Sequence, residues 1–136
     1  MGLPKPTHTA GEALRYMEKA KGLLKAAAIE DNIYLDKKPV REAFGTSYLA
    51  ILEAINEALI KKGLLTRKEL PKSVDGYMAT IKKHLSVTKT GKLVREFDSL
   101  YEALHIAGYY RGLLYQVPLV KEAMREADTF IKKVLP

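Results

Sequence analysis

The sequence predicts an all-α protein, an antiparallel up-and-down bundle of four long helices plus one short helix. Apolar residues recur at spacings of three and four along most of the chain, and β-branched residues are scattered instead of forming alternating runs. With 136 residues, 47% of them hydrophobic, and no cysteine, the chain can bury a core without disulfides. We expect a flexible leader at residues 1–8 and a single domain at residues 9–136.

The first helix is expected from about residue 9 to residue 29. Thr9 followed by Glu12 fits a capping box, in which two side chains bond orphan backbone amides at the helix start. The expected buried stripe consists of Ala13, Leu14, Met17, Ala20, Leu24 and Ala27 or Ala28. Residues 30–38 are expected to form a loop.

The second helix is expected to begin near Asp36 and Pro39, because proline is tolerated in a first turn, and to end near Gly63. Two apolar rows run along it. They are Phe44, Tyr48, Ile51, Ile55 and Ala58, and then Gly45, Leu49, Leu52, Asn56 and Leu59. A helix apolar over so wide an arc is central in the bundle or lies at a subunit interface.

Three further helices complete the predicted bundle. Ser73 is expected to cap a short helix over residues 73–85, which Gly76 weakens by roughly 1 kcal/mol, so tertiary packing must hold it. The fourth helix is expected over residues 92–115, and Pro118 separates it from the fifth. The buried positions expected in the fifth helix are Val120, Ala123, Met124, Ala127, Ile131 and Val134.

Several classes of site are not expected. His8, His84 and His105 lie far apart and cysteine is absent, so we expect no metal site. No glycine-rich phosphate loop or dinucleotide fingerprint occurs, and we expect no cofactor. The uncharged apolar stretches are shorter than the roughly 18–20 residues of a membrane span, and residues 1–9 lack a secretory apolar region. A cytoplasmic location is the default expectation.

Five polar residues are predicted to form an internal cluster that joins the second and fourth helices: Glu42, Asn56, Asp98, His105 and Arg111. Arg111 lies in the apolar register of its helix, so we expect its guanidinium to be drawn partly inward. Asn56 interrupts an apolar row and costs roughly 1–3 kcal/mol if it is buried without a hydrogen bond. The favoured role of the cluster is to fix helix register or dimer geometry, and an active site is the alternative.

His105 is the residue around which a catalytic hypothesis can be built. Tyr101 and Glu102 precede it by four and three residues, and Asp98 lies two turns away on the same side. A histidine oriented by a carboxylate can act as a general base, which would suit a hydrolase. We favour a structural, hydrogen-bonded histidine beside the core.

Glycines and tyrosines suggest close contacts. Gly45, Gly108 and Gly112 cost roughly 1 kcal/mol each inside a helix, and close approach of a neighbouring backbone or tyrosine ring is the usual reason. A narrow ligand cleft is the alternative. Tyr109 and Tyr110 stand close to an arginine, a combination favoured at protein interfaces and at stacked bases.

The net charge of +7 is placed unevenly along the chain. Residues 61–95 hold ten basic residues against two acidic ones. A polyanion-binding surface is one interpretation, and its predicted members are Arg67, Lys68, Lys72, Lys82, Lys83, Lys89 and Lys92. The alternative is that these cations offset the carbonyl charge at helix ends and keep the protein in solution.

Two stretches carry a resemblance to known proteins: YLDKKPVREAFGTSYLAILEAI from Tyr34 and FDSLYEALHIAGYYRG from Phe97. They resemble a small bacterial family of uncharacterised proteins, and the likeness covers most of the chain. The build is similar to that of HEPN-type helical bundles and ribosomal intervening-sequence proteins, which are often dimeric and in several branches associated with RNA. HEPN nucleases carry an arginine a few residues before a histidine, whereas nine residues separate Arg95 from His105 here. We therefore carry over no catalytic residue.

The favoured functional hypothesis is a non-enzymatic, homo-oligomeric interaction protein, most simply a dimer. Its second and fourth helices would meet through Glu42, Gly45, Asn56, His105, Gly108 and Arg111. The alternative is an RNA- or DNA-binding HEPN-like module that uses the basic segment at residues 61–95.

Overall fold

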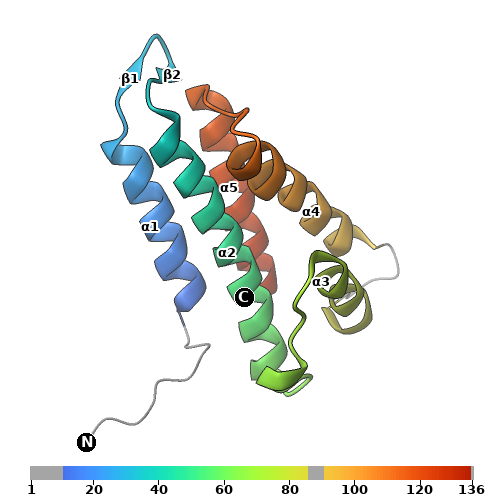
Figure 1. Ribbon diagram of the computed structural model, residues 1–136. Helices are drawn as coiled ribbons and strands as arrows, with labels where there is room; N and C mark the ends of the chain where they lie inside the picture. Colours follow the sequence, from blue (N-terminus) through green and yellow to red (C-terminus); the bar gives the residue numbers. More distant parts are fainter. Residues whose placement is uncertain (1–10, 86–90, 136) are drawn as a thin grey trace, which may run out of the picture.

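The computed structural model describes residues 11–85 and 91–135, and their architecture confirms the predicted all-α bundle. The predicted leader, Thr9 of the expected capping box and Lys89 lie outside the described residues. The elements are α1 (Glu12–Ala26), β1 (Ile29–Glu30), β2 (Ile33–Tyr34), α2 (Lys37–Lys61), η1 (Arg67–Glu69), α3 (Val74–Thr80), η2 (Ile81–Leu85), α4 (Lys92–Leu100), η3 (Tyr101–Tyr110) and α5 (Val117–Val134). Helices α1 and α2 lie side by side, α4 and η3 cross obliquely, and α5 lies behind α2 (Figure 1).

The connection between α1 and α2 is a small hairpin, and the prediction of a plain loop there is wrong. Asp31 and Asn32 have φ values of 52° and 65°, the left-handed conformation that a tight two-residue hairpin turn requires. The Tyr34 N–H donates to the Tyr115 carbonyl at 3.0 Å, and the Val117 N–H donates to the Asn32 carbonyl at 2.9 Å. The hairpin therefore joins the α1–α2 connection to the start of α5.

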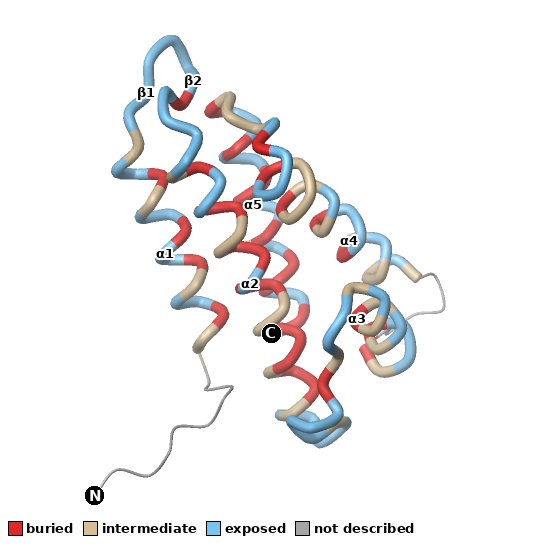
Figure 2. The backbone as a smooth tube through the Cα atoms, viewed as in Figure 1, coloured by how far each residue is buried: buried red, intermediate tan, exposed pale blue. Residues whose placement is uncertain are grey.

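Helix α2 is the centre of the bundle, with α1, η3 and α5 packed around it. It begins as predicted, because an Asp36 carboxylate oxygen accepts the Lys38 N–H at 3.0 Å. Buried residues follow the length of α2 and the facing side of α5 (Figure 2). The two predicted rows differ, because the first is buried throughout, while in the second Leu49 is 46% exposed. One face of α2 is thus left open.

The third and fourth helices differ from their predicted form. The Ser73 cap is confirmed, since its hydroxyl accepts the Gly76 N–H at 3.1 Å, but the helix becomes π-helical from Ile81. Helix α4 continues into η3, which is π-helical and ends at Tyr110 instead of residue 115. Gly112 follows with a φ of 62°, a conformation that cannot continue a helix.

Two of the glycines allow the close helix approach that the sequence predicted. A Cβ at Gly108 would lie 2.3 Å from the ring of Phe44, and a Cβ at Gly45 would lie 2.8 Å from the ring of Tyr109. These contacts join α2 to η3 within one chain. The expected buried stripe of α1 is confirmed at Ala13, Met17, Ala20 and Leu24, whereas Leu14 is exposed. The helix ends at Ala26, before the predicted residue 29, and neither Ala27 nor Ala28 is buried.

Candidate functional site

The predicted internal polar cluster is not assembled. Asn56 is buried, and its side-chain oxygen accepts a hydrogen bond from the Tyr77 hydroxyl at 2.9 Å, a partner that we did not predict. Glu42, Asp98 and Arg111 are exposed, and His105 is half-buried. Arg111 follows the last residue of η3, so the helical register that would have turned it inward no longer applies.

His105 lies among aromatic rings. Its ring stacks on Tyr101 at 5.5 Å and on Tyr109 at 5.9 Å between centroids, and Tyr48 of α2 lies 4.9 Å away. We call these four residues the aromatic row. Among the described residues, neither Asp98 nor any other carboxylate forms an ion pair with His105.

Burial affects the pKa of one member of the aromatic row, Tyr48. It raises the pKa of Tyr48 to about 12, and the negative charges that Tyr101 and Tyr77 would carry on ionisation add to the shift. The Tyr48 phenol therefore keeps its proton at neutral pH. The row offers flat apolar surface with few charges, a chemistry that suits contact with another apolar or aromatic surface.

The aromatic row borders a groove of about 490 Å³ between α1, α2 and η3, which we call the α2 groove. It is lined by Lys19, Leu23, Glu42, Gly45, Thr46, Tyr48, Leu49, His105 and Tyr109. Glu42 and His105 of the predicted cluster meet here, together with Gly45. The contribution of α1 could not be predicted from the sequence, because nothing in the periodicity shows which side of α1 borders the open face of α2.

Arg41 is a further residue that the sequence analysis missed. Its Nε donates to the Tyr109 carbonyl at 2.9 Å, and an Nη donates to the Tyr110 carbonyl at 3.0 Å. These bonds satisfy carbonyls at the end of η3 and hold Tyr109 against Gly45. The residues around Arg41 in the sequence give no sign that its guanidinium caps the carbonyls of another helix, so this contact could not be predicted.

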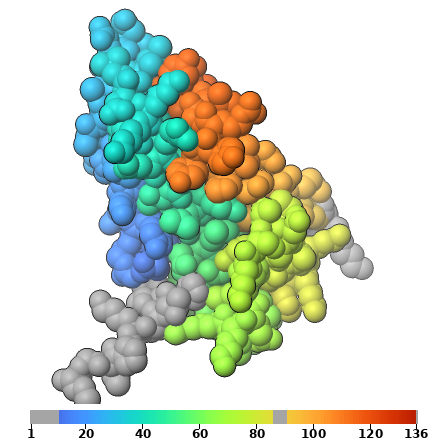
Figure 3. Space-filling view, in the orientation of Figure 1, coloured from blue at the N-terminus to red at the C-terminus, as the bar shows by residue number. Residues whose placement is uncertain are grey.

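The predicted polyanion-binding residues that the structure describes are all exposed. They lie on η1, η2, the approach to α3 and the start of α4, a region that occupies one end of the molecule (Figure 3). Lys61 and Lys62, at the end of α2, adjoin the last turn of α5. We call the described cations of this end the basic pole: Lys61, Lys62, Arg67, Lys68, Lys72, Lys82, Lys83 and Lys92.

Glu69 is one of the two acidic residues within this segment. Its carboxylate accepts hydrogen bonds from the Thr66 N–H and the Thr66 hydroxyl, both at 2.9 Å, in a capping box. These bonds hold the pKa of Glu69 below its ordinary value. The carboxylate is therefore engaged by the backbone at the start of η1.

Comparison with known proteins identifies the family but no activity. Residues 8–135 match the family described as Domain of unknown function (DUF5618). The chain belongs to this family. A solved structure of a protein of unknown function from Dyadobacter fermentans is similar, with 29% identity, a TM-score of 0.71, and coverage of 90% of this chain and 89% of that one. No curated protein matches.

The DUF5618 match agrees with the resemblance to an uncharacterised family. Neither match describes a HEPN-type protein, so that likeness stays a prediction from the sequence. Within residues 11–85 and 91–135, no helix is long and apolar enough to cross a membrane. The same residues contain no group of three histidine or acidic side chains that could hold a metal ion.

Proposed function

We propose that this DUF5618 protein is a homo-oligomeric interaction protein whose contact surface is the α2 groove. The observation that carries the proposal is the exposure of Leu49 on α2, the most central helix, and of Tyr109 on η3, at 46% and 43%. Single exposed apolar residues are ordinary. Leu49 and Tyr109 line the α2 groove together with half-buried Leu23 and with Tyr48 and His105 of the aromatic row, so they form part of one apolar surface.

A second copy of the chain suits this surface because its charges can pair with each other. Lys19 lies on the α1 side of the groove and Glu42 lies on α2. In a two-fold contact, a residue of one copy meets a different residue of the other, and the reverse contact follows by symmetry. Lys19 of each copy would then face Glu42 of its partner.

A stable contact would extend beyond the groove itself. Helix α2 has 25 residues and is therefore about 37 Å long. The groove takes its α2 residues from the stretch between Glu42 and Leu49, so the roughly 800 Å² per partner of a standard interface would also include the adjoining edges of α1 and η3. In this proposal His105 is part of the contact surface.

The test is the mass of the protein in solution, measured by sedimentation velocity. We expect the wild type to be a dimer and Leu49→Glu to be a folded monomer with the helical circular dichroism of the wild type, because Leu49 is exposed within one chain. Leu119→Glu is the matched control, since Leu119 is 51% exposed on α5, and it should stay dimeric. A monomeric wild type, or equal behaviour of the two variants, rejects the proposal.

The basic pole supports a second candidate function, a nucleic-acid-binding, HEPN-like module. Its eight cations are exposed at one end of the molecule, and Glu69 beside them is engaged by Thr66. Clustered cations bind phosphate backbones by releasing condensed counterions, so the affinity depends steeply on salt.

Fluorescence anisotropy of labelled single-stranded RNA and of duplex DNA tests this second function at several salt concentrations. Neutralising Lys82, Lys83 and Lys92 to glutamine should weaken binding and lower the salt slope by about two to three units. A control with the same net charge neutralises three exposed cations outside the basic pole, Lys37, Lys38 and Arg111. Equal losses in both triple variants, or no binding at low salt, would reject the basic pole as a binding site.

A further inference from the structure

A second cleft lies on another side of the bundle, between α1 and α5. Helix α1 packs along α2 and contacts α5 over only a short stretch, and the β1–β2 hairpin borders the space beside them. This α1–α5 cleft has a volume of about 540 Å³ and is lined by Lys21, Leu24, Lys25, Ile29, Tyr34, Lys121, Met124, Arg125 and Asp128. No residue of the aromatic row or the basic pole contributes to it.

The inner wall of the cleft is apolar and contains one hydroxyl. Leu24, Tyr34 and Met124 are buried, and Tyr34 is only 4% exposed. No described residue forms a hydrogen bond with the Tyr34 hydroxyl. Every side-chain polar atom that is fully buried among the described residues does have a partner, so the Tyr34 hydroxyl is not one of these fully buried atoms. The hydroxyl must therefore reach solvent, and the cleft that its ring lines provides the route.

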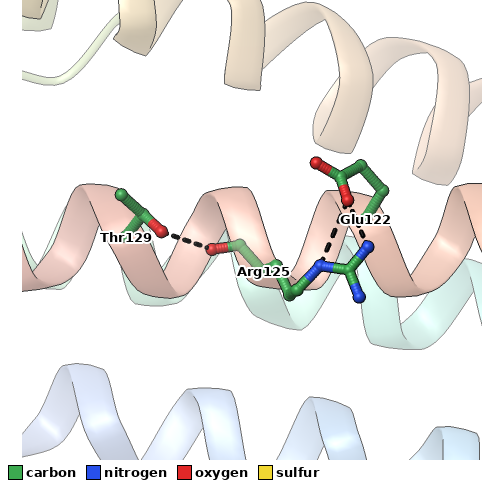
Figure 4. Close-up of polar contacts among 3 residues, drawn as sticks. All are labelled: Glu122, Arg125 and Thr129. Carbon is green, nitrogen blue, oxygen red and sulfur yellow. Dashed lines mark hydrogen bonds and ion pairs between the residues drawn. The ribbon is translucent and has the colours of Figure 1, made fainter.

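The rim of the cleft is cationic. Lys21 forms an ion pair with Asp128 at 2.6 Å, and Arg125 pairs with Glu122 one turn earlier on α5, as Figure 4 shows. Within the described part of the chain, Lys25 and Lys121 have no ion-pair partner.

We propose that the α1–α5 cleft binds a small amphipathic anion, with an apolar body against Leu24 and Met124 and a single carboxylate or sulfonate between Lys25 and Lys121. The volume lies within the range of small-molecule sites, which combine an apolar lining with a few polar groups that fix orientation. The Tyr34 hydroxyl supplies a hydrogen-bond donor. Burial raises the pKa of Tyr34, so this group keeps its proton at neutral pH.

The charge balance distinguishes the two clefts of the molecule. The α2 groove is lined by one lysine and one glutamate, whereas the α1–α5 cleft is lined by four cations and one carboxylate. After the ion pairs of Lys21 and Arg125 are taken into account, two positive charges remain beside an apolar wall. A neutral or cationic ligand would leave them unpaired, and an amphipathic anion matches both features.

The first experiment titrates the full chain with the fluorescent sulfonate 8-anilinonaphthalene-1-sulfonate and displaces it with decanoate. We expect saturable binding at one site. The double variant Lys25→Gln/Lys121→Gln should weaken both ligands about tenfold, and Tyr34→Phe should weaken them about threefold through the lost hydrogen bond. The control Lys38→Gln/Lys132→Gln removes the same net charge outside the cleft and should leave both affinities unchanged.

The second experiment locates the ligand by NMR of methionine methyl groups. Decanoate should shift the Met124 methyl resonance, which lies in the cleft, and leave that of Met78, on α3, unchanged. Equal loss of affinity in the two double variants would show attraction by net charge alone. That result, the absence of saturable binding, or an unshifted Met124 resonance would overturn the proposal.

Discussion

Replacing Gly108 with alanine tests the close contact between η3 and α2. The added Cβ would lie 2.3 Å from Cγ and 2.5 and 2.7 Å from the two Cδ atoms of Phe44, whereas non-bonded carbons normally stand about 3.5–4.0 Å apart. Phe44 is fully buried, so its ring has no free space and η3 must move by about 1 Å. Such overpacking costs typically 1–3 kcal/mol or more, and alanine returns about 1 kcal/mol of helix propensity. We expect a net loss of about 2 kcal/mol.

Urea denaturation followed by circular dichroism measures this loss. Gly22→Ala is the control, because Gly22 lies within α1 with open space around it, and that change should stabilise by about 0.5–1 kcal/mol. Phe44→Leu shortens the opposing ring, so the double variant with Gly108→Ala should lose less than the sum of the single losses. If Gly108→Ala stays within about 0.5 kcal/mol of the wild type, the inferred contact is wrong.

Three further predictions concern stability. Tyr77→Phe removes the hydrogen bond to buried Asn56 and should cost about 1–3 kcal/mol in urea denaturation; a neutral effect would show that Asn56 has another partner. The pKa of Tyr48 is raised from 10.0 to about 12, so the unfolded chain loses this proton first. The protonated Tyr48 phenol therefore contributes stability that is complete below pH 10 and is lost as the pH rises toward about 12. The free energy of unfolding should fall over this range by up to about 1.4 kcal/mol per pH unit, and Tyr48→Phe should remove that slope. An identical slope in the variant would contradict the assignment. Asp36→Ala should lower the free energy of unfolding by about 1 kcal/mol, whereas Asp36→Asn should retain most of the cap, and equal losses would argue against the Lys38 N–H bond.

The core positions of the helices could be predicted because their signal is local. Every residue expected to be buried in α5 is buried, since apolar residues at helical spacing share one face whatever that face meets. The helix caps at Asp36 and Ser73 were equally predictable, because capping depends on residues within one turn.

The errors occurred where distant segments meet. The hairpin depends on the left-handed backbone of Asp31 and Asn32 and on hydrogen bonds to residues that follow η3. Arg111 lost its predicted inward position because the helix ends at Tyr110, before Gly112. Among the candidate site residues, Asn56 accepts a hydrogen bond from Tyr77 of α3, a contact between two helices that the sequence pattern did not predict.

The sequence by itself determined that the chain is helical, which residues α5 buries, and that the positive charge is concentrated in one segment. Only the tertiary structure decided that Leu49 is exposed while Leu59 of the same row is buried, and that α1 and α5 leave a cationic cleft between them. The physical reason is that helical periodicity records the direction of a side chain relative to its own axis. Whether that direction meets another helix, open water or a partner depends on how the helices pack, and packing is a property of the whole chain.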